Sequence, residues 1–374
     1  MPARRVTAAR AALLRTLAVM LAGVVLALRP ASAEPLFGFT AFPYDLSTEA
    51  EDRVHAIIDE RADIFAIHMD QCLPWAEMLA DAPFPAWLEA SWQEVKRRLP
   101  QGRIVYLATT PTGMDRETLA IACGASEDAP VPLPDAIADR PLDDPLVMEA
   151  YGRYVQRNID LFRPRYVNIG IEMSEMALRR PERWPAFERL YLATLQRLRQ
   201  RNPGVGIGIE MVLQSLLEPR VAALVRPAVE AGDFLCLSFY PYGGDAGVFW
   251  GAPPLAPPPE QWRGPLQWVR GYSSKPLAVC ETGYTTREVT LADSGLRFPG
   301  DEALQAAFLG DLVRTAREDG YLFVIWFITV DYERLLDKLP GAAEWMRIWA
   351  YTGLYASDLT PKPALGAWPR PHAD

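Results

Sequence analysis

Short apolar runs alternate with longer amphipathic segments along the chain from residue 34 onwards. Most of the apolar runs show no strict alternation of apolar and polar residues, which is typical of strands covered on both faces. The longer segments between them have the spacing of apolar residues that is typical of helices. The pattern predicts eight strands, at residues 36–42, 64–68, 104–109, 166–172, 206–211, 234–240, 276–281 and 323–328.

The predicted helices fall between these strands. Thr48-Glu49-Ala50-Glu51 has the form of a capping box and predicts the start of the first helix. Further helices are predicted at residues 85–98, 181–201, 218–231 and 301–319.

Repetition of strand and helix in one chain predicts an α/β fold, a single (β/α)8 barrel that spans residues 34–374. A doubly wound open sheet is the alternative fold, but its first turn is usually rich in glycine, and no such turn is present. Two long loops, residues 124–144 and 242–261, follow strands. We expect both at the C-terminal face of the barrel, where active sites are built, with Trp250 and Trp262 as sugar platforms.

The first 33 residues have the features of a secretory signal peptide. Four arginines precede an uncharged, mostly apolar stretch at residues 16–28, and Ala31-Ser32-Ala33 forms a small-residue cleavage site. We therefore predict an exported protein, periplasmic or extracellular, with an uncleaved N-terminal anchor as the alternative. The apolar stretch is short for a membrane span, so no stable membrane insertion is expected after cleavage.

Removal of that segment would take away five arginines and change the net charge from −9 to −14. Such an acidic surface argues against nucleic acid or an anionic membrane as a partner.

Four cysteines follow the predicted signal peptide, and their spacing matches no metal-ligand pattern. Export makes disulfides permissible, and Cys72 and Cys123 both fall in predicted loops, so they are the candidate pair. Cys236 and Cys280 lie inside apolar runs and are expected to be small buried hydrophobic residues.

Carboxylate and aromatic residues gather where the predicted strands end, whereas the strand interiors are almost free of charge. In a barrel these ends meet at one face, which predicts an acidic cleft with aromatic walls. Such a cleft suits an oligosaccharide or polysaccharide, because sugar rings stack on aromatic rings and polar groups bind their hydroxyls. The candidate substrate-binding residues are Tyr44, His68, Asp70, Glu210, Tyr240, Tyr242, Tyr284 and Trp326.

Two glutamates at strand ends are the candidate catalytic residues. Glycoside hydrolysis needs two carboxyl groups that flank the scissile bond. Glu172 and Glu281 end the fourth and seventh predicted strands and would face each other across the barrel. Glu281 is the candidate nucleophile and Glu172 the candidate acid and base. Glu175 is expected to be a solvated residue in the first turn of a helix.

The chain resembles the clan of (β/α)8 retaining glycoside hydrolases with an acid/base glutamate after strand four and a nucleophile after strand seven. The nearest likeness is to the endo-β-1,4-galactanase type. Residues 168–172 (NIGIE), 238–241 (SFYP) and 279–284 (VCETGY) resemble its motifs on strands four, six and seven. Trp326 resembles the tryptophan on strand eight that forms the floor of the first subsite. Residues 352–355 (TGLY) and 360–365 (TPKPAL) resemble the closing segment of that family.

Ile171 departs from this resemblance, since the family has asparagine immediately before the acid/base glutamate to hold the 2-hydroxyl of the sugar. The alternation of side chains along a strand predicts that Ile171 packs toward a helix, opposite Glu172. His68, Asp70 and Glu210 are the candidate substitutes for the missing contact. The departure also favours an alternative function, a carbohydrate-binding or envelope-associated barrel that has lost full activity.

A metal-dependent hydrolase that uses His68 and Asp70 is the second alternative. The chain has only three histidines, and His55 and His372 fall on a predicted helix face and in the tail. We therefore expect no metal centre and no cofactor. Neither a phosphate-binding P-loop motif nor a G-x-S-x-G motif occurs, so nucleotide and serine-esterase chemistry have no support.

Overall fold

The computed structural model describes residues 34–100, 102–127, 129–339 and 343–372. The described fold belongs to one compact unit, Pro35–Asp374. The predicted signal peptide at residues 1–33 lies outside the described residues. Within these ranges no helix has both the length and the apolar character needed to cross a membrane.

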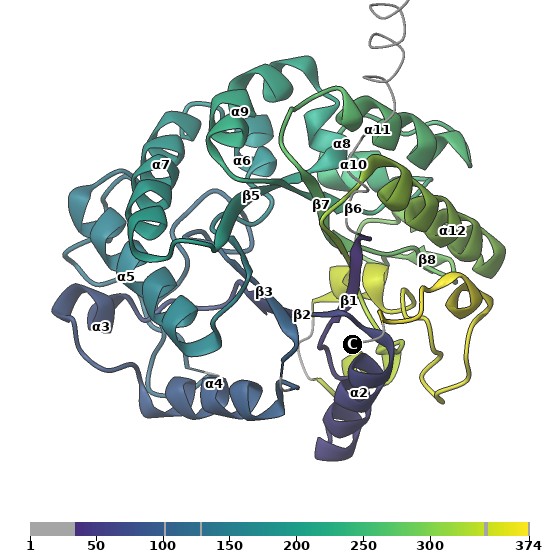
Figure 1. Ribbon diagram of the computed structural model, residues 1–374, viewed down its shortest axis with the longest axis horizontal. Coiled ribbons are helices and arrows are strands. Elements are labelled where there is room, and N and C mark those ends of the chain that lie inside the picture. The colour runs from purple at the N-terminus through teal and green to yellow at the C-terminus, as the bar shows by residue number, and fades with distance from the viewer. Residues whose placement is uncertain (1–33, 101, 128, 340–342, 373–374) are drawn as a thin grey trace, which may run out of the picture. The chain divides into compact units, whose positions relative to one another are not determined.

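Eight parallel strands close into a barrel in the order β1-β10-β7-β6-β5-β4-β3-β2, with helices around the outside (Figure 1). The predicted single (β/α)8 barrel is confirmed. An additional two-stranded sheet, β8 (Val289–Thr290) and β9 (Arg297–Phe298), lies in the connection after β7. The barrel strands are β1 (Leu36–Thr40), β2 (Ile64–Met69), β3 (Ile104–Thr109), β4 (Tyr166–Asn168), β5 (Gly206–Val212), β6 (Leu235–Phe239), β7 (Leu277–Thr282) and β10 (Phe323–Trp326).

Long helices connect most of the strands, and short ones add to the loops at the carboxyl ends of the strands. The first helix starts at the predicted residue, but its N-cap is Ser47, whose hydroxyl accepts a hydrogen bond from the amide of Ala50 at 3.1 Å. The predicted capping box was therefore wrong by one position. The helices are α2 (Thr48–Arg61), α3 (Trp75–Ala80), α4 (Ala86–Arg98), α5 (Pro145–Phe162), α6 (Ser174–Arg179), α7 (Trp184–Arg201), α8 (Leu213–Leu216), α9 (Pro219–Ala231), α10 (Ala246–Trp250), α11 (Glu260–Arg270), α12 (Glu302–Asp319), α13 (Glu333–Lys338), η1 (Glu344–Trp349) and η2 (Pro363–Ala367).

The buried apolar residues form two main layers that the barrel wall separates. Most of them pack between the strands and the surrounding helices. A smaller cluster fills the barrel interior, so the barrel is a packed core and not a pore. The interior cluster consists of Ile64, Ala66, Tyr106, Ala108, Ile171, Phe234, Cys236, Ala278, Cys280, Phe323 and Ile325.

The four cysteines form two disulfides. Cys72 bonds to Cys123, with their Cα atoms 4.9 Å apart, which confirms the predicted pair. Cys236 bonds to Cys280, with a Cα separation of 5.5 Å, so the expectation that these two are separate hydrophobic residues was wrong. Both are buried as predicted, but they sit on the neighbouring strands β6 and β7 and face each other inside the barrel.

Candidate functional site

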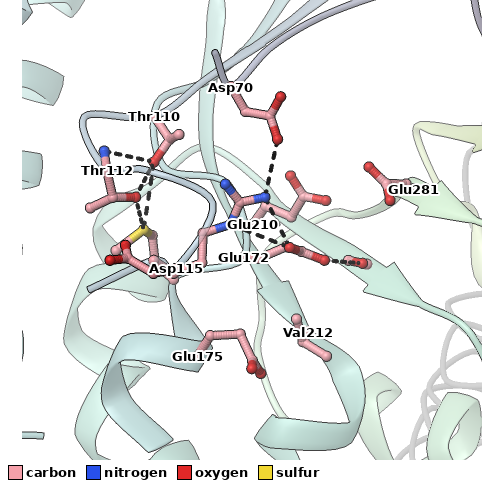
Figure 2. Close-up of polar contacts among 12 residues, drawn as sticks. Asp70, Thr110, Thr112, Asp115, Glu172, Glu175, Glu210, Val212 and Glu281 are labelled. Atoms are coloured by element: carbon pink, nitrogen blue, oxygen red, sulfur yellow. Dashed lines mark hydrogen bonds and ion pairs between the residues drawn. The ribbon is translucent and has the colours of Figure 1, made fainter. Parts of the chain in front are cut away.

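A cavity of about 970 Å³ opens at the carboxyl ends of the barrel strands. Its lining includes five of the titratable side chains at these ends, and it extends to residues of α2 and α4. Figure 2 shows the carboxylates that gather here, from β5, β7 and the segments after β2 and β4. The five titratable residues are His68, Asp70, Glu172, Glu175 and Glu281.

Glu172 does not end a strand, because β4 stops at Asn168. The chain then bends, and the amide of Glu210 on β5 donates to the carbonyl of Gly170 at 3.0 Å. Glu172 itself has a φ of 55°, in the left-handed region that only a few per cent of non-glycine residues adopt. Such conformations cost about 1–3 kcal/mol and gather at functional sites, where the surrounding fold enforces them.

This bend overturns the predicted orientation of Ile171. Alternation along a continuous strand would turn Ile171 toward a helix, but the extended geometry ends three residues earlier. Ile171 is instead fully buried in the cluster that fills the barrel interior, beside Tyr106 and Cys236. Gly170 takes the outward position, where an added Cβ would meet Phe187 at 2.9 Å. An apolar group therefore lies under the site where the resemblance places an amide.

The carboxylate of Glu172 accepts hydrogen bonds on both oxygens. Arg116 donates to Oε2 from Nη2 at 3.1 Å and from Nε at 3.3 Å, and Ser238 on β6 donates to Oε1 at 2.8 Å. The Arg116 side chain is only 5% exposed, so little water screens the ion pair. Arg116 also contacts Asp70 at 3.4 Å. One buried guanidinium thus holds two of the site's carboxylates (Figure 2).

Arg116 lies in the loop after β3, and no sequence pattern marked it. The loop is turned by Asp115, whose carboxylate accepts from the amides of Glu117 and Thr118 at 2.8 and 3.1 Å. Arg116 has a φ of 57° at the tight part of this turn, where its amide donates to Gly113. The turn directs the side chain inward, toward a carboxylate 56 residues further along the chain. Burial opposes the charge of Arg116, but Glu172 and Asp70 outweigh it and raise the pKa of the guanidinium.

Glu281 lies on β7 and has a different set of partners. The hydroxyl of Tyr240 donates to its Oε1 at 2.6 Å, and Nδ1 of His68 lies 3.7 Å from its Oε2. Burial raises the pKa of Glu281, and the negative charge of Glu172 adds to this effect, whereas His68 opposes it. Glu172 and Glu281 therefore share one cavity but differ in their surroundings, since only Glu172 contacts an arginine.

His68 bridges Glu281 and Asp70, because its Nε2 lies 3.4 Å from Oδ2 of Asp70. Burial lowers the pKa of the imidazole, but Asp70 and Glu281 more than compensate and raise it to about 9. In turn, burial works against the charge of Asp70, and His68 and Arg116 hold the pKa of that carboxyl well below its usual range. At neutral pH His68 is thus a cation between two carboxylates.

The raised pKa of His68 predicts a loss of stability at alkaline pH. Its folded-state pKa of about 9 lies above the unfolded value of 6.5, so the stabilisation is complete below pH 6.5 and is lost as the pH rises through 9. We expect the free energy of unfolding to fall between pH 7 and pH 10 in the wild type and to fall less in His68→Gln. Urea denaturation at a series of pH values measures this difference. His55→Gln is the matched control and should retain the wild-type slope, because burial lowers the pKa of His55.

Glu210 lies beneath the cavity and is only 1% exposed. Its Oε2 accepts a hydrogen bond from Asn168 at 2.6 Å, and its Oε1 has no hydrogen-bond partner among the described residues. Burial raises the pKa of Glu210 well above its usual range, and the charges of Glu281 and Glu172 raise it further. Glu210 is not part of the cavity lining.

Glu175 was predicted to be solvated, and this was wrong. It is 4% exposed, lines the cavity, and receives hydrogen bonds from Ser215 and Arg179. Burial raises its pKa to about 7, although both partners oppose this shift. The short helix α6 that carries Glu175 packs against α8 and α9 instead of lying open to solvent.

Aromatic and apolar side chains from three segments wall the cavity. One segment is α10, another is η1, and the third is the end of β10. The ring of Trp349 packs against Tyr240 with centroids 5.8 Å apart, so this wall touches the tyrosine that binds Glu281. The wall residues are Phe249, Trp250, Phe327, Trp345, Met346 and Trp349. Only Trp250 was named from the sequence as a platform.

Several predicted contact residues lie behind the cavity wall. Trp326 is fully buried against Phe308, and its indole donates to the carbonyl of Thr352 at 2.8 Å. It does not line the cavity, whereas its neighbour Phe327 does. Trp262 likewise is buried and donates to Asp311 at 2.9 Å.

The four tyrosines of the predicted set are also outside the lining. Tyr284 is buried and its hydroxyl accepts from Gln261 at 2.9 Å, while Tyr242 packs between Tyr240 and Tyr284. Tyr44 is half-buried at the edge of the core. Tyr240 reaches the site only through its hydroxyl on Glu281.

The two long loops contribute unequally. The loop at 242–261 contains α10 and supplies Phe249 and Trp250. Of the described residues in the loop at 124–144, only Glu127 is in the lining, and the shorter loop around Arg116 takes its place. Across residues 34–100, 102–127, 129–339 and 343–372, no group of three or more histidine, cysteine, aspartate or glutamate residues could hold a metal ion.

Comparison with known proteins gives structural likenesses without a sequence family. No family model and no curated protein matches the chain. An exo-β-1,4-mannosidase from Opitutaceae bacterium strain TAV5 is similar over 89% of this chain, with 15% identity and a TM-score of 0.58. The match covers 58% of the mannosidase, so the chain spans little more than half the length of that protein.

Two further solved structures are similar over most of the chain. One is a GH39 enzyme from Xanthomonas axonopodis pv. citri, with 16% identity, a TM-score of 0.52 and coverage of 92% of this chain and 71% of that one. The other is xylanase 10B from Thermotoga petrophila RKU-1 in complex with xylobiose, with 12% identity, a TM-score of 0.51 and coverage of 89% and 92%. At these identities the likeness shows the fold alone: a (β/α)8 barrel of the kind that these glycoside-cleaving enzymes share.

Proposed function

We propose that the chain is a glycoside hydrolase that cleaves a β-linked glycan with retention of configuration. One observation carries the proposal: Glu172 and Glu281 face one cavity with aromatic walls, and each carboxylate accepts a hydroxyl hydrogen bond from β6 or its end. A retaining mechanism needs two carboxyl groups with different roles in one cleft. The named activities of the three similar structures agree with this reaction class.

In the proposed reaction, the carboxylate of Glu281 attacks the anomeric carbon while the bond to the leaving oxygen breaks. Glu172 gives its proton to that oxygen. Glu172 then takes a proton from water, and the resulting hydroxide attacks the same carbon and releases Glu281. Tyr240 holds Oε1 of Glu281, so the other oxygen faces His68 and is the one free to attack.

The hydroxyl of Ser238 can accommodate a proton on Oε1 of Glu172. A hydroxyl both accepts and donates, so the 2.8 Å contact with Oε1 can also hold a protonated carboxyl. Arg116 occupies the opposite oxygen. The proton and the guanidinium therefore do not compete for one atom.

Export to the periplasm or the cell exterior, through residues 1–33, belongs to the same proposal. Its partner would be an oligosaccharide or polysaccharide. The galactanase-type likeness makes β-1,4-galactan the first substrate to test.

The test is turnover of aryl β-glycosides that differ in the acidity of the leaving phenol, together with a panel of β-linked polysaccharides. A strongly acidic phenol leaves without help, whereas a weakly acidic one needs a proton. Glu172→Gln should therefore lose roughly 10²–10⁴-fold in rate on weakly acidic phenols and polysaccharides and much less on acidic ones. Proton NMR of the first-formed product should show the β anomer. Equal losses on all leaving groups would remove Glu172 from the acid role.

A carbohydrate-binding barrel without turnover is the second candidate, and two observations favour it. Arg116 makes a buried ion pair with Glu172, and Ile171 places an apolar group where the resemblance has asparagine. Titration calorimetry with the same polysaccharides distinguishes the two candidates. Binding without any product formation would support this second function over the first.

A further inference from the structure

Strand β7 contains one more residue than either of its neighbours at the level of the site. Against β6, Leu237 pairs with Val279, but the next residue, Ser238, pairs with Glu281. The residue between them, Cys280, has no partner in this register. A β-bulge of this kind breaks the regular ladder and redirects a side chain, and bulges are common next to active sites.

The same irregularity is present on the other side of β7. Val324 of β10 pairs with Val279, and Trp326, two residues later, pairs with Thr282, three residues later. The extra residue is therefore a property of β7 itself. Without it, Cys280 and Glu281 would point to opposite faces of the sheet, because side chains alternate along a regular strand. With it, Cys280 faces the interior cluster and Glu281 still lines the cavity.

The bulged residue is covalently linked to the strand that binds both glutamates. Cys280 forms a disulfide with Cys236 of β6. Alternation along β6 places Cys236 and Ser238 on the same face. Ser238 donates to Glu172, and Tyr240, just beyond β6, donates to Glu281. The disulfide thus lies directly below the hydrogen bonds that hold the proposed acid and nucleophile.

We propose that Cys236 and Cys280 are positioning residues for the proposed reaction: their disulfide holds the bulge of β7 against β6 and keeps Glu281 on Tyr240 and in the cavity with Glu172. The ladder alone holds a bulge poorly, because the extra residue is unpaired. A covalent bond supplies the missing constraint. The inference rests on the proposed function for its catalytic consequence.

The chain contains its own control for this proposal. The disulfides Cys236–Cys280 and Cys72–Cys123 close segments of similar length, with sequence separations of 44 and 51. Their removal should therefore have similar effects on the entropy of the unfolded chain. Only the first links the two strands that carry Ser238 and Glu281.

The experiment compares Cys236→Ala/Cys280→Ala with Cys72→Ala/Cys123→Ala in the full chain. We expect kcat of the first variant to fall about 10²-fold with little change in KM, because small displacements of the reacting groups have effects of this size. The second should retain kcat while its Tm falls by a similar amount. If Cys236→Ala/Cys280→Ala does not fold, it is replaced by Cys236→Ala/Cys280→Val, which restores part of the lost side-chain volume.

A second readout is independent of turnover. Carbon NMR of protein with labelled glutamate, with Glu281 assigned from Glu281→Gln, follows the titration of this carboxyl. We expect its pKa to move toward the ordinary value in the first variant and to stay raised in the control. An unchanged titration and an unchanged kcat in the first variant would overturn the inference, as would reduced thiols at Cys236 and Cys280 in the purified wild type. Should the wild type cleave no glycoside at all, the proposed function fails, and the NMR titration still decides the positioning role.

Discussion

Glu281→Gln is expected to abolish glycoside turnover, with a loss of at least ~10⁴-fold in kcat, because an amide cannot form the glycosyl ester. Unlike the loss in Glu172→Gln, this loss should be the same for acidic and weakly acidic leaving groups, since every substrate needs the nucleophile. The measurement is initial rate on the aryl glycoside series at saturating substrate. Binding of an unreactive oligosaccharide should survive, because the change removes neither the aromatic wall nor the shape of the cavity.

The Tm of Glu281→Gln distinguishes the loss of the nucleophile from unfolding of the variant. Burial raises the pKa of Glu281, so the folded protein bears a cost for its charge, and neutral glutamine removes that cost. We expect the Tm of Glu281→Gln to equal or exceed that of the wild type, a pattern typical of active-site residues. Glu60→Gln, at a side chain that is 63% exposed, is the control and should alter neither rate nor Tm. Turnover that survives Glu281→Gln would remove Glu281 from the nucleophile role.

Arg116→Met is expected to destabilise the fold by about 1–3 kcal/mol at neutral pH, because it removes a buried cation from two half-buried carboxylates, of which only Asp70 retains another cation, His68. Asp70 and Glu172 both contact this guanidinium, and its side chain is 5% exposed. Methionine has a similar length and fills the same space. The loss of stability therefore reflects the missing charge and hydrogen bonds more than missing volume. Denaturation by urea measures the change in the free energy of unfolding.

The pH dependence and a matched arginine test the cause. The defect of Arg116→Met should shrink as the pH falls, because protonation removes the uncompensated charges, and it should shrink in the double variant with Asp70→Asn. Arg97→Met removes an arginine that is 69% exposed and pairs with Glu94, so it should cost less than about 1 kcal/mol. If the loss of stability in Arg116→Met were the same at every pH and in the double variant with Asp70→Asn, lost packing would be its cause instead.

The barrel could be predicted from the sequence because the signal is repeated and local. Each apolar run predicts a strand from its own residues alone. Few architectures are compatible with eight such strands. Glu172 and Glu281 could be selected as candidates for the same reason, because each is a charged residue that follows an apolar run. The disulfide between Cys72 and Cys123 followed from two cysteines in loops.

The parts of the site that could not be predicted depend on contacts between distant segments. Arg116 belongs to an ordinary turn, and only the closed barrel brings it to Glu172. Trp349 lies on a 3-10 helix far along the chain from Tyr240, against which it packs. The error at Ile171 has a local cause, since alternation assumes a regular strand and β4 ends early. Helices α5 and α11 were overlooked beside the two long loops, and α11 contains a proline.

The contacts of Asp70 have a consequence for the whole site. Five groups follow one another around the cavity with alternating sign: Glu281, His68, Asp70, Arg116 and Glu172. Fully ionised, this chain of three anions and two cations carries one negative charge, and a single added proton makes it neutral. In the proposed reaction, the proton that general acid catalysis requires is the one that balances the charge of this chain.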